Sequence, residues 1–124
     1  MFWNILWVII GGGIGSATRY LLTLLASRLF GSNFPFGTLS VNLGGCLLIG
    51  LIFSLADRGI VSPAMRLLLM TGFLGGLTTF STYALESTNF FKSMEISTAL
   101  LNIGLNNFGG FILVLTGFWL GRLM

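Results

Sequence analysis

The sequence predicts an all-α integral membrane protein with four transmembrane helices per chain, and three observations support this. Of the 124 residues, 55% are hydrophobic, and only 7% are charged. Soluble domains carry roughly 25% charged residues, so this chain cannot form the polar shell that a soluble fold needs. The charged residues also leave four uncharged runs, each close to the ~20 residues that cross a bilayer. These runs are residues 1–18, 29–56, 67–85 and 96–121.

The four helices are expected in one transmembrane domain that covers residues 1–124. Their expected bounds are about 4–27, 36–56, 65–90 and 97–121. Short turns separate them: Gly31 to Pro35 follows the first helix, and Asp57-Arg58-Gly59 closes the second. Ser62-Pro63 is typical of a helix start, with serine as the N-cap and proline as the first helical residue.

The composition excludes most chemistry. The chain has no histidine and a single cysteine, Cys46. A zinc site of His and Cys ligands, a disulfide framework and histidine-dependent catalysis are therefore excluded, and we do not expect an enzyme. The six basic residues are scattered rather than clustered, so we expect the lipid bilayer as a partner and no nucleic acid.

The charges flanking the helices do not fix an orientation in the membrane. One side would carry Arg58, Arg66 and Arg122, and the other would carry Arg28 and Lys92. The positive-inside rule needs a larger bias than three to two. Either so few charges are too crude a guide, or the chain inserts in both orientations and assembles as an antiparallel dimer.

Glycine spacings predict close contact between helices. Four helices barely enclose a polar pathway, so a transporting chain of this size should oligomerise. Pairs of small residues four positions apart allow two backbones to approach closely, either between chains or within one chain. The pairs are Gly11 with Gly15, Gly12 with Ser16, Gly72 with Gly76, and Gly117 with Gly121.

Several polar side chains lie inside the expected helices. Arg19 should face protein, water or a partner, or else extend its guanidinium to the membrane interface. Thr38 and Asn42 are four residues apart and share a helix face. Asn42 is either a hydrogen-bonded tie between helices or a pore ligand, and the tie is the commoner case. Asn102, Asn106 and Asn107 form a polar stripe on the fourth helix.

Residues 71–83 favour a break in the third helix near Gly75–Thr79. Glycines there are followed by hydroxyl and aromatic side chains, and glycine and threonine weaken a helix. Freed backbone carbonyls at such a break can bind ions. The alternative is a continuous helix whose hydroxyls bond to carbonyls four residues back.

The polar groups inside the membrane suit a small anion. They are amides, hydroxyls, aromatic ring edges and one arginine, and neutral donors hold an anion loosely enough to release it. Glu86, late in the third helix, is the acid that a coupled exporter could use. A small dual-topology proton- or cation-coupled exporter is therefore the alternative, and a membrane scaffold without transport is a third possibility.

Three motifs carry a resemblance to a known family. They are GGGIGSATRY at residues 11–20, FPFGTLSVN at residues 34–42 and GFLGGLTTFSTY at residues 72–83. In this order and spacing they make the chain resemble the Fluc/CrcB family of fluoride channels. The resemblance implies passive export of fluoride from the cytoplasm through the bacterial inner (plasma) membrane, which lowers fluoride toxicity. It also implies an antiparallel dual-topology homodimer with two pores, which would account for the balanced charges.

The resemblance also implies the residues of the fluoride pore. Asn42 matches the pore asparagine, and Phe80 matches the first phenylalanine of an aromatic pair. Ser81 and Thr82 match hydroxyls beside the pathway. Tyr83 stands where the family usually has a second phenylalanine, so it keeps a ring edge and adds a phenol, which could bind the anion more tightly or bond elsewhere.

Other matched positions concern ions at the edge of the pore. Gly75 and Thr78 match residues whose backbone carbonyls hold a structural sodium ion (Na+) at the dimer centre. Arg19 matches an arginine suited to drawing anions to the pore entrance. On the fourth helix, the family often has hydroxyl or histidine side chains, whereas this chain offers Asn106 and Gly110.

Overall fold

The computed structural model describes residues 1–124 and contains four helical spans, as the sequence predicts. Each span begins and ends within three residues of its expected bounds. The first two are α1 (Phe2–Phe30) and α2 (Phe36–Asp57). The third comprises α3 (Pro63–Arg66), η1 (Leu67–Leu74), α4 (Gly75–Leu77) and α5 (Phe80–Lys92). The fourth comprises α6 (Ile96–Gly104), η2 (Leu105–Gly109) and α7 (Gly110–Leu123).

The connections end the helices by identifiable local means. Gly31 follows α1 with a φ of 77°, and Gly59 follows α2 with a φ of 74°, a region that glycine adopts without steric cost. Ser62 caps α3 as predicted: its Oγ accepts a hydrogen bond of 3.3 Å from the Met65 N–H, and Pro63 is the first helical residue.

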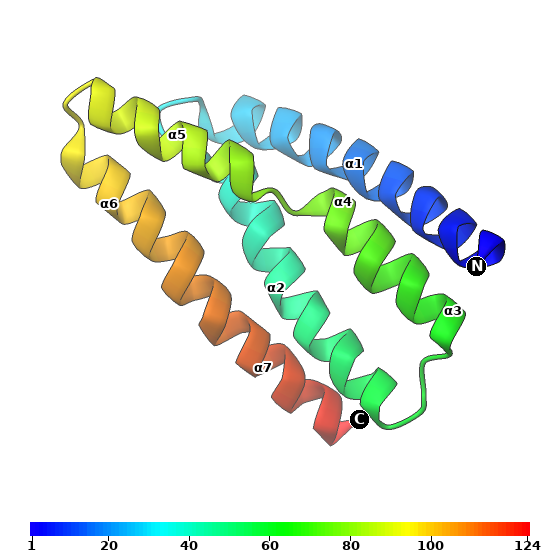
Figure 1. The fold of residues 1–124 in the computed structure, drawn as a ribbon. Helices are drawn as coiled ribbons and strands as arrows, with labels where there is room; N and C mark the ends of the chain where they lie inside the picture. The colour runs from blue at the N-terminus through cyan, green and yellow to red at the C-terminus, as the bar shows by residue number, and fades with distance from the viewer.

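The third span divides its packing between two neighbours. Its first part, α3 to α4, lies along α1, whereas α5 turns away and lies along α6 (Figure 1). The remaining large contact is between α2 and α7, which run side by side across the molecule. The two segments η1 and η2 are π-helical, a winding that often occurs at functional sites.

Glycine makes these close helix contacts possible, and the contacts lie within one chain. A Cβ atom at Gly72 would lie 2.9 Å from the Cα of Gly11, and a Cβ at Gly15 would overlap the carbonyl of Phe73. On the other pair of helices, a Cβ at Gly117 would overlap the carbonyl of Leu47. These small residues are therefore used inside the chain, which answers the question that their spacing left open.

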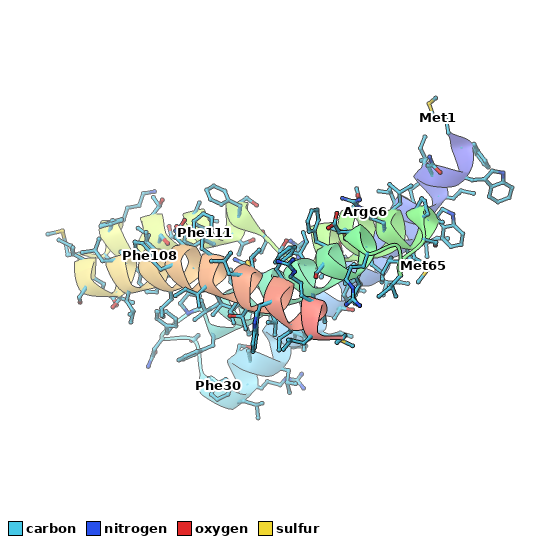
Figure 2. The ribbon with its side chains drawn as sticks, turned by 90° about the horizontal axis from the view of Figure 1, so that it is seen from below. Met1, Phe30, Met65, Arg66, Phe108 and Phe111 are labelled. Atoms are coloured by element: carbon cyan, nitrogen blue, oxygen red, sulfur yellow. The ribbon has the colours of Figure 1, made fainter.

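The outer surface is apolar. Only 20 of the 124 residues are buried, so most large hydrophobic side chains face outward, as they do in a protein surrounded by lipid. Figure 2 labels three of these exposed side chains, which are Phe30 of the first span and Phe108 and Phe111 of the fourth span. The chain is a multi-pass membrane protein by the length and hydropathy of its four spans.

The contact between α2 and α7 predicts a difference between two glycines of the same helix. At Gly50, an alanine Cβ would overlap the Val114 carbonyl and lie 2.9 Å from the Phe118 nitrogen. We expect Gly50→Ala to destabilise the protein by about 1–3 kcal/mol, the usual cost of overpacking. At Gly44 a Cβ meets no atom within 4 Å, so Gly44→Ala should be neutral or stabilising.

The midpoint of thermal unfolding in detergent measures this difference in stability, with size-exclusion chromatography as the readout of folded protein. Equal midpoints for Gly50→Ala and the native chain would contradict the close contact between α2 and α7.

Candidate functional site

The third span breaks at Thr78 and Thr79. Both residues are extended, with φ, ψ of −82°, 155° at Thr78 and −150°, 113° at Thr79. Thr79 then caps α5, because its Oγ1 accepts a hydrogen bond of 3.3 Å from the Thr82 N–H. The predicted break is confirmed, and the alternative of a continuous helix through residues 72–83 is wrong.

Asn42 of α2 holds the backbone of this break. Its Oδ1 accepts a hydrogen bond of 2.8 Å from the Thr79 N–H, and its Nδ2 donates one of 3.2 Å to the Thr79 carbonyl. One amide side chain therefore satisfies both polar backbone groups of the same residue. Asn42 is the tie between helices that was one of its two expected roles. Thr79, its partner, was expected only as the end of the break and not as a partner of Asn42.

The break frees the backbone carbonyls of Gly75 and Thr78 from their helical partners. In a continuous helix, the Thr79 N–H would bond to the Gly75 carbonyl and the Thr82 N–H to the Thr78 carbonyl. Here the first donates to Asn42 and the second to the Thr79 hydroxyl. The Arg19 Nη1 donates a hydrogen bond of 3.2 Å to the Thr78 carbonyl. Arg19 therefore faces protein, which was one of its expected surroundings.

A row of amides continues from Asn42 along the fourth span. The Asn42 Nδ2 donates to the Asn106 Oδ1 over 2.9 Å. The Asn106 Nδ2 donates to both the carbonyl and the Oδ1 of Asn102, each over 3.0 Å. Asn102 is fully buried, and its Nδ2 donates to the Ser87 hydroxyl on α5 over 3.0 Å. The stripe predicted on the fourth helix thus joins α2, the fourth span and α5.

A cavity of about 320 Å³ lies beside the break, and it brings together most of the predicted site residues. Its polar and aromatic lining residues are Asn42, Thr78, Thr79, Phe80, Tyr83, Asn106 and Asn107, and Gly75 also lines it. Ser81 and Thr82 are exposed on the first turn of α5 and do not line this cavity. Gly110 is buried against α2 instead, where a Cβ would lie 3.3 Å from the Cys46 Sγ.

The aromatic pair adjoins the break on α5. The rings of Phe80 and Tyr83 meet edge to face, with centroids 5.4 Å apart and planes at 69°. Phe80 is 76% exposed on the single chain, whereas Tyr83 is 8% exposed. The Tyr83 Oη accepts a hydrogen bond of 2.8 Å from the Asn107 Nδ2. Asn107 is therefore a residue of the site, although the sequence placed it only in the polar stripe and assigned it no role.

Glu86 lies in a second cavity, of about 330 Å³, that shares no lining residue with the first. The Thr38 hydroxyl donates to its Oε1 over 2.6 Å, and its Oε2 is buried without a hydrogen-bond partner. Thr38 and Asn42 share a face of α2 as expected, but they serve different cavities.

Comparison with known proteins places this architecture in a family. The chain matches the family described as "CrcB-like protein, Camphor Resistance (CrcB)" over residues 6–118. A relative from Maridesulfovibrio salexigens is 46% identical over 120 residues, which is 96% of this chain and 95% of the relative. One from Shewanella amazonensis is 43% identical over 119 residues, 96% of this chain and 93% of the relative.

A third relative, from Clostridium perfringens, is 41% identical over 116 residues, which is 93% of this chain and 91% of the relative. All three relatives are named "Fluoride-specific ion channel FluC". With the family matched over residues 6–118 and such identities over nearly the whole length, the chain belongs to the CrcB-like (Fluc/CrcB) family of membrane proteins.

Proposed function

We propose that this chain is a fluoride-selective ion channel that passively exports fluoride from the cytoplasm across the bacterial plasma membrane. The relatives are ion channels rather than enzymes. The observation that carries the proposal is the cavity beside the helix break, whose lining includes amides, hydroxyls and aromatic rings beside aliphatic side chains, and no acidic side chain. Such a lining contacts an anion without repelling it and releases it easily.

The proposed pathway runs along the break and the first turn of α5. Ring edges of Phe80 and Tyr83 carry partial positive charge that attracts an anion. The hydroxyls of Ser81 and Thr82 lie on the same turn. Asn42 and Asn106 form part of the wall and hold its shape, and the guanidinium of Arg19 supplies positive charge next to Thr78. In this proposal Arg19 draws fluoride toward the pore entrance.

We further propose an antiparallel, dual-topology homodimer with two pores. The nearly equal numbers of basic residues on the two sides of the membrane support insertion in both orientations. The exposed ring of Phe80 beside polar backbone supports a second chain that covers the break. A backbone break at membrane depth is tolerated where protein or water surrounds it.

A structural sodium ion fits the carbonyls at the break. The Gly75 and Thr78 carbonyls have lost their helical donors, and a carbonyl oxygen has two lone pairs, so the Thr78 carbonyl can bind a cation beside Arg19. A Cβ at Gly75 would meet a single atom, the Met70 carbonyl oxygen at 4.0 Å, so this glycine is open to a partner. Two carbonyls from each chain would hold the ion and fasten the two breaks together.

The coupled exporter is the less favoured alternative, and one observation supports it. The Glu86 Oε2 is buried without a partner, as a proton-binding acid could be. The names of the relatives and the separate cavity of Glu86 argue against it.

The role of Asn42 predicts the effect of removing its donors. Asn42→Asp keeps the acceptor for the Thr79 N–H but leaves two oxygens, the Thr79 carbonyl and the Asn106 Oδ1, facing a carboxylate. Unpaired buried groups cost about 1–3 kcal/mol each, and the new charge repels the anion, so fluoride flux should fall by at least about tenfold. Asn33→Asp makes the same chemical change in an exposed turn and should leave the flux unchanged.

A fluoride electrode that records efflux from proteoliposomes measures both variants, and size-exclusion chromatography checks their assembly. Native flux from Asn42→Asp would remove Asn42 from the pore.

The two candidate functions differ at Glu86. For a passive channel, Glu86→Gln keeps an acceptor for the Thr38 hydroxyl and should change fluoride flux by less than about threefold, since a hydrogen bond is worth only ~0.5–1.5 kcal/mol. For a coupled exporter, the same change should abolish transport together with its dependence on a pH gradient. Efflux measured with and without a pH gradient separates the two functions.

The sodium proposal predicts a specific sensitivity at Gly75. Gly75→Leu should block the approach of a second chain, lower the dimer fraction and remove any stabilisation by sodium. Gly13→Leu, at another glycine whose Cβ meets no atom within 4 Å, is the control, and Thr78→Ser keeps the backbone and should be mild. Thermal unfolding in sodium chloride and in N-methylglucamine chloride gives the readout. Equal midpoints of the native protein in the two salts would contradict the sodium site.

A further inference from the structure

We propose that the phenolic hydroxyl of Tyr83 is the side-chain hydrogen-bond donor that this chain presents to fluoride in the cavity beside the break. The inference rests on the proposed function, because it takes fluoride as the transported ion. It follows from an account of every O–H and N–H hydrogen on the side chains that line the cavity.

The amide hydrogens of the cavity are all committed within the chain. The Asn42 Nδ2 donates to the Thr79 carbonyl and to Asn106. The Asn106 Nδ2 donates to the carbonyl and to the side-chain oxygen of Asn102. The Asn107 Nδ2 donates to the Ile103 carbonyl and to Tyr83. An amide has two such hydrogens, so none of these three side chains has one left for an anion.

Backbone partners fix the orientation of each amide. The Asn42 Oδ1 faces the Thr79 N–H, which can only donate. The Nδ2 atoms of Asn106 and Asn107 face the carbonyls of Asn102 and Ile103, which can only accept. Exchanging oxygen and nitrogen in any of these amides would place donor against donor or acceptor against acceptor.

The threonine hydroxyls that line the cavity are committed as well. The Thr78 hydroxyl donates to the Leu74 carbonyl over 2.9 Å. The Thr79 hydroxyl donates to the Thr82 hydroxyl oxygen over 3.0 Å, while it accepts from the Thr82 N–H. Cys46 also lines the cavity, but its S–H is a weak donor.

Tyr83 is the exception. Its oxygen accepts from Asn107, so its own hydrogen must point elsewhere, and no oxygen or nitrogen of the chain accepts it. The ring is 8% exposed and lies edge to face with Phe80, so the hydroxyl is held in place beside the aromatic pair. Asn107 is a positioning residue, because its bond to the phenol oxygen directs the hydrogen away from the fourth span.

A phenol donor changes binding more than it changes conduction. Hydrogen bonds to charged groups are about twice as strong as neutral ones, so a single phenol should hold fluoride well. Conduction requires release as well as binding, so tighter binding does not raise the flux in proportion. We therefore expect Tyr83 to set the affinity for fluoride, while a phenylalanine there still conducts.

Fluoride binding by Tyr83→Phe tests this inference. The substitution removes the hydroxyl and keeps the ring, and Asn107 retains its bond to the Ile103 carbonyl. Calorimetry of sodium fluoride binding to the full chain in nanodiscs measures the affinity. The affinity of Tyr83→Phe for fluoride should be about ten- to a hundredfold weaker than that of the native chain. Tyr20→Phe is the matched control, because the chain has two tyrosines and Tyr20 is 67% exposed on α1.

Tyrosine absorbance provides a readout that a purely structural role would not change. Fluoride should shift the phenol absorption band in the native protein and in Tyr20→Phe, and should not shift it in Tyr83→Phe. If Tyr83→Phe binds fluoride as tightly as the native chain while both conduct it, the inference about Tyr83 fails and the channel stands. If the native chain in liposomes passes no fluoride, the proposed function fails instead.

Discussion

The structure depends on one requirement of the membrane interior, which is that every polar backbone group needs a partner. The third span violates helical bonding at Thr78 and Thr79, and a single side chain, Asn42, satisfies both the N–H and the carbonyl of Thr79. Because α2 supplies this partner, the break forms where α2 passes the third span. The two halves of that span can then pack against different helices, α1 and α6.

The same requirement explains why the many amides of this site offer so little to an anion. Asn42, Asn106 and Asn102 form a continuous row whose hydrogens end on backbone carbonyls, on one another and on the Ser87 hydroxyl. This row fixes the break relative to the fourth span. In the proposed channel, contacts with a transported ion then fall to groups outside the row, namely ring edges, the hydroxyls on the first turn of α5 and the phenol of Tyr83.

The sequence predicts features that depend on local composition, and it leaves undecided those that depend on tertiary contact. The long uncharged runs between charged residues are enough to predict the four spans. The pair Gly75-Gly76 followed by threonines is enough to predict the break. The choice between tie and pore ligand for Asn42 needed its partner, Thr79, 37 residues away. The direction of Arg19 likewise needed the Thr78 carbonyl, 59 residues away. The π-helical winding of η1 and η2 has no signal in the hydrophobic pattern.

The packing of the glycines narrows where a second chain can bind. The glycines that would suit a dimer contact, such as Gly11, Gly15 and Gly72, are already in contact with backbone of their own chain. Gly75 is open, and it lies three residues before the break and five before the exposed ring of Phe80. A dimer interface centred on this surface would place the partner against the cavity wall. In the proposed homodimer, the residues that contact the partner, Gly75 and Phe80, also line the path of the ion. Assembly of the two chains and closure of the pore wall are therefore one event.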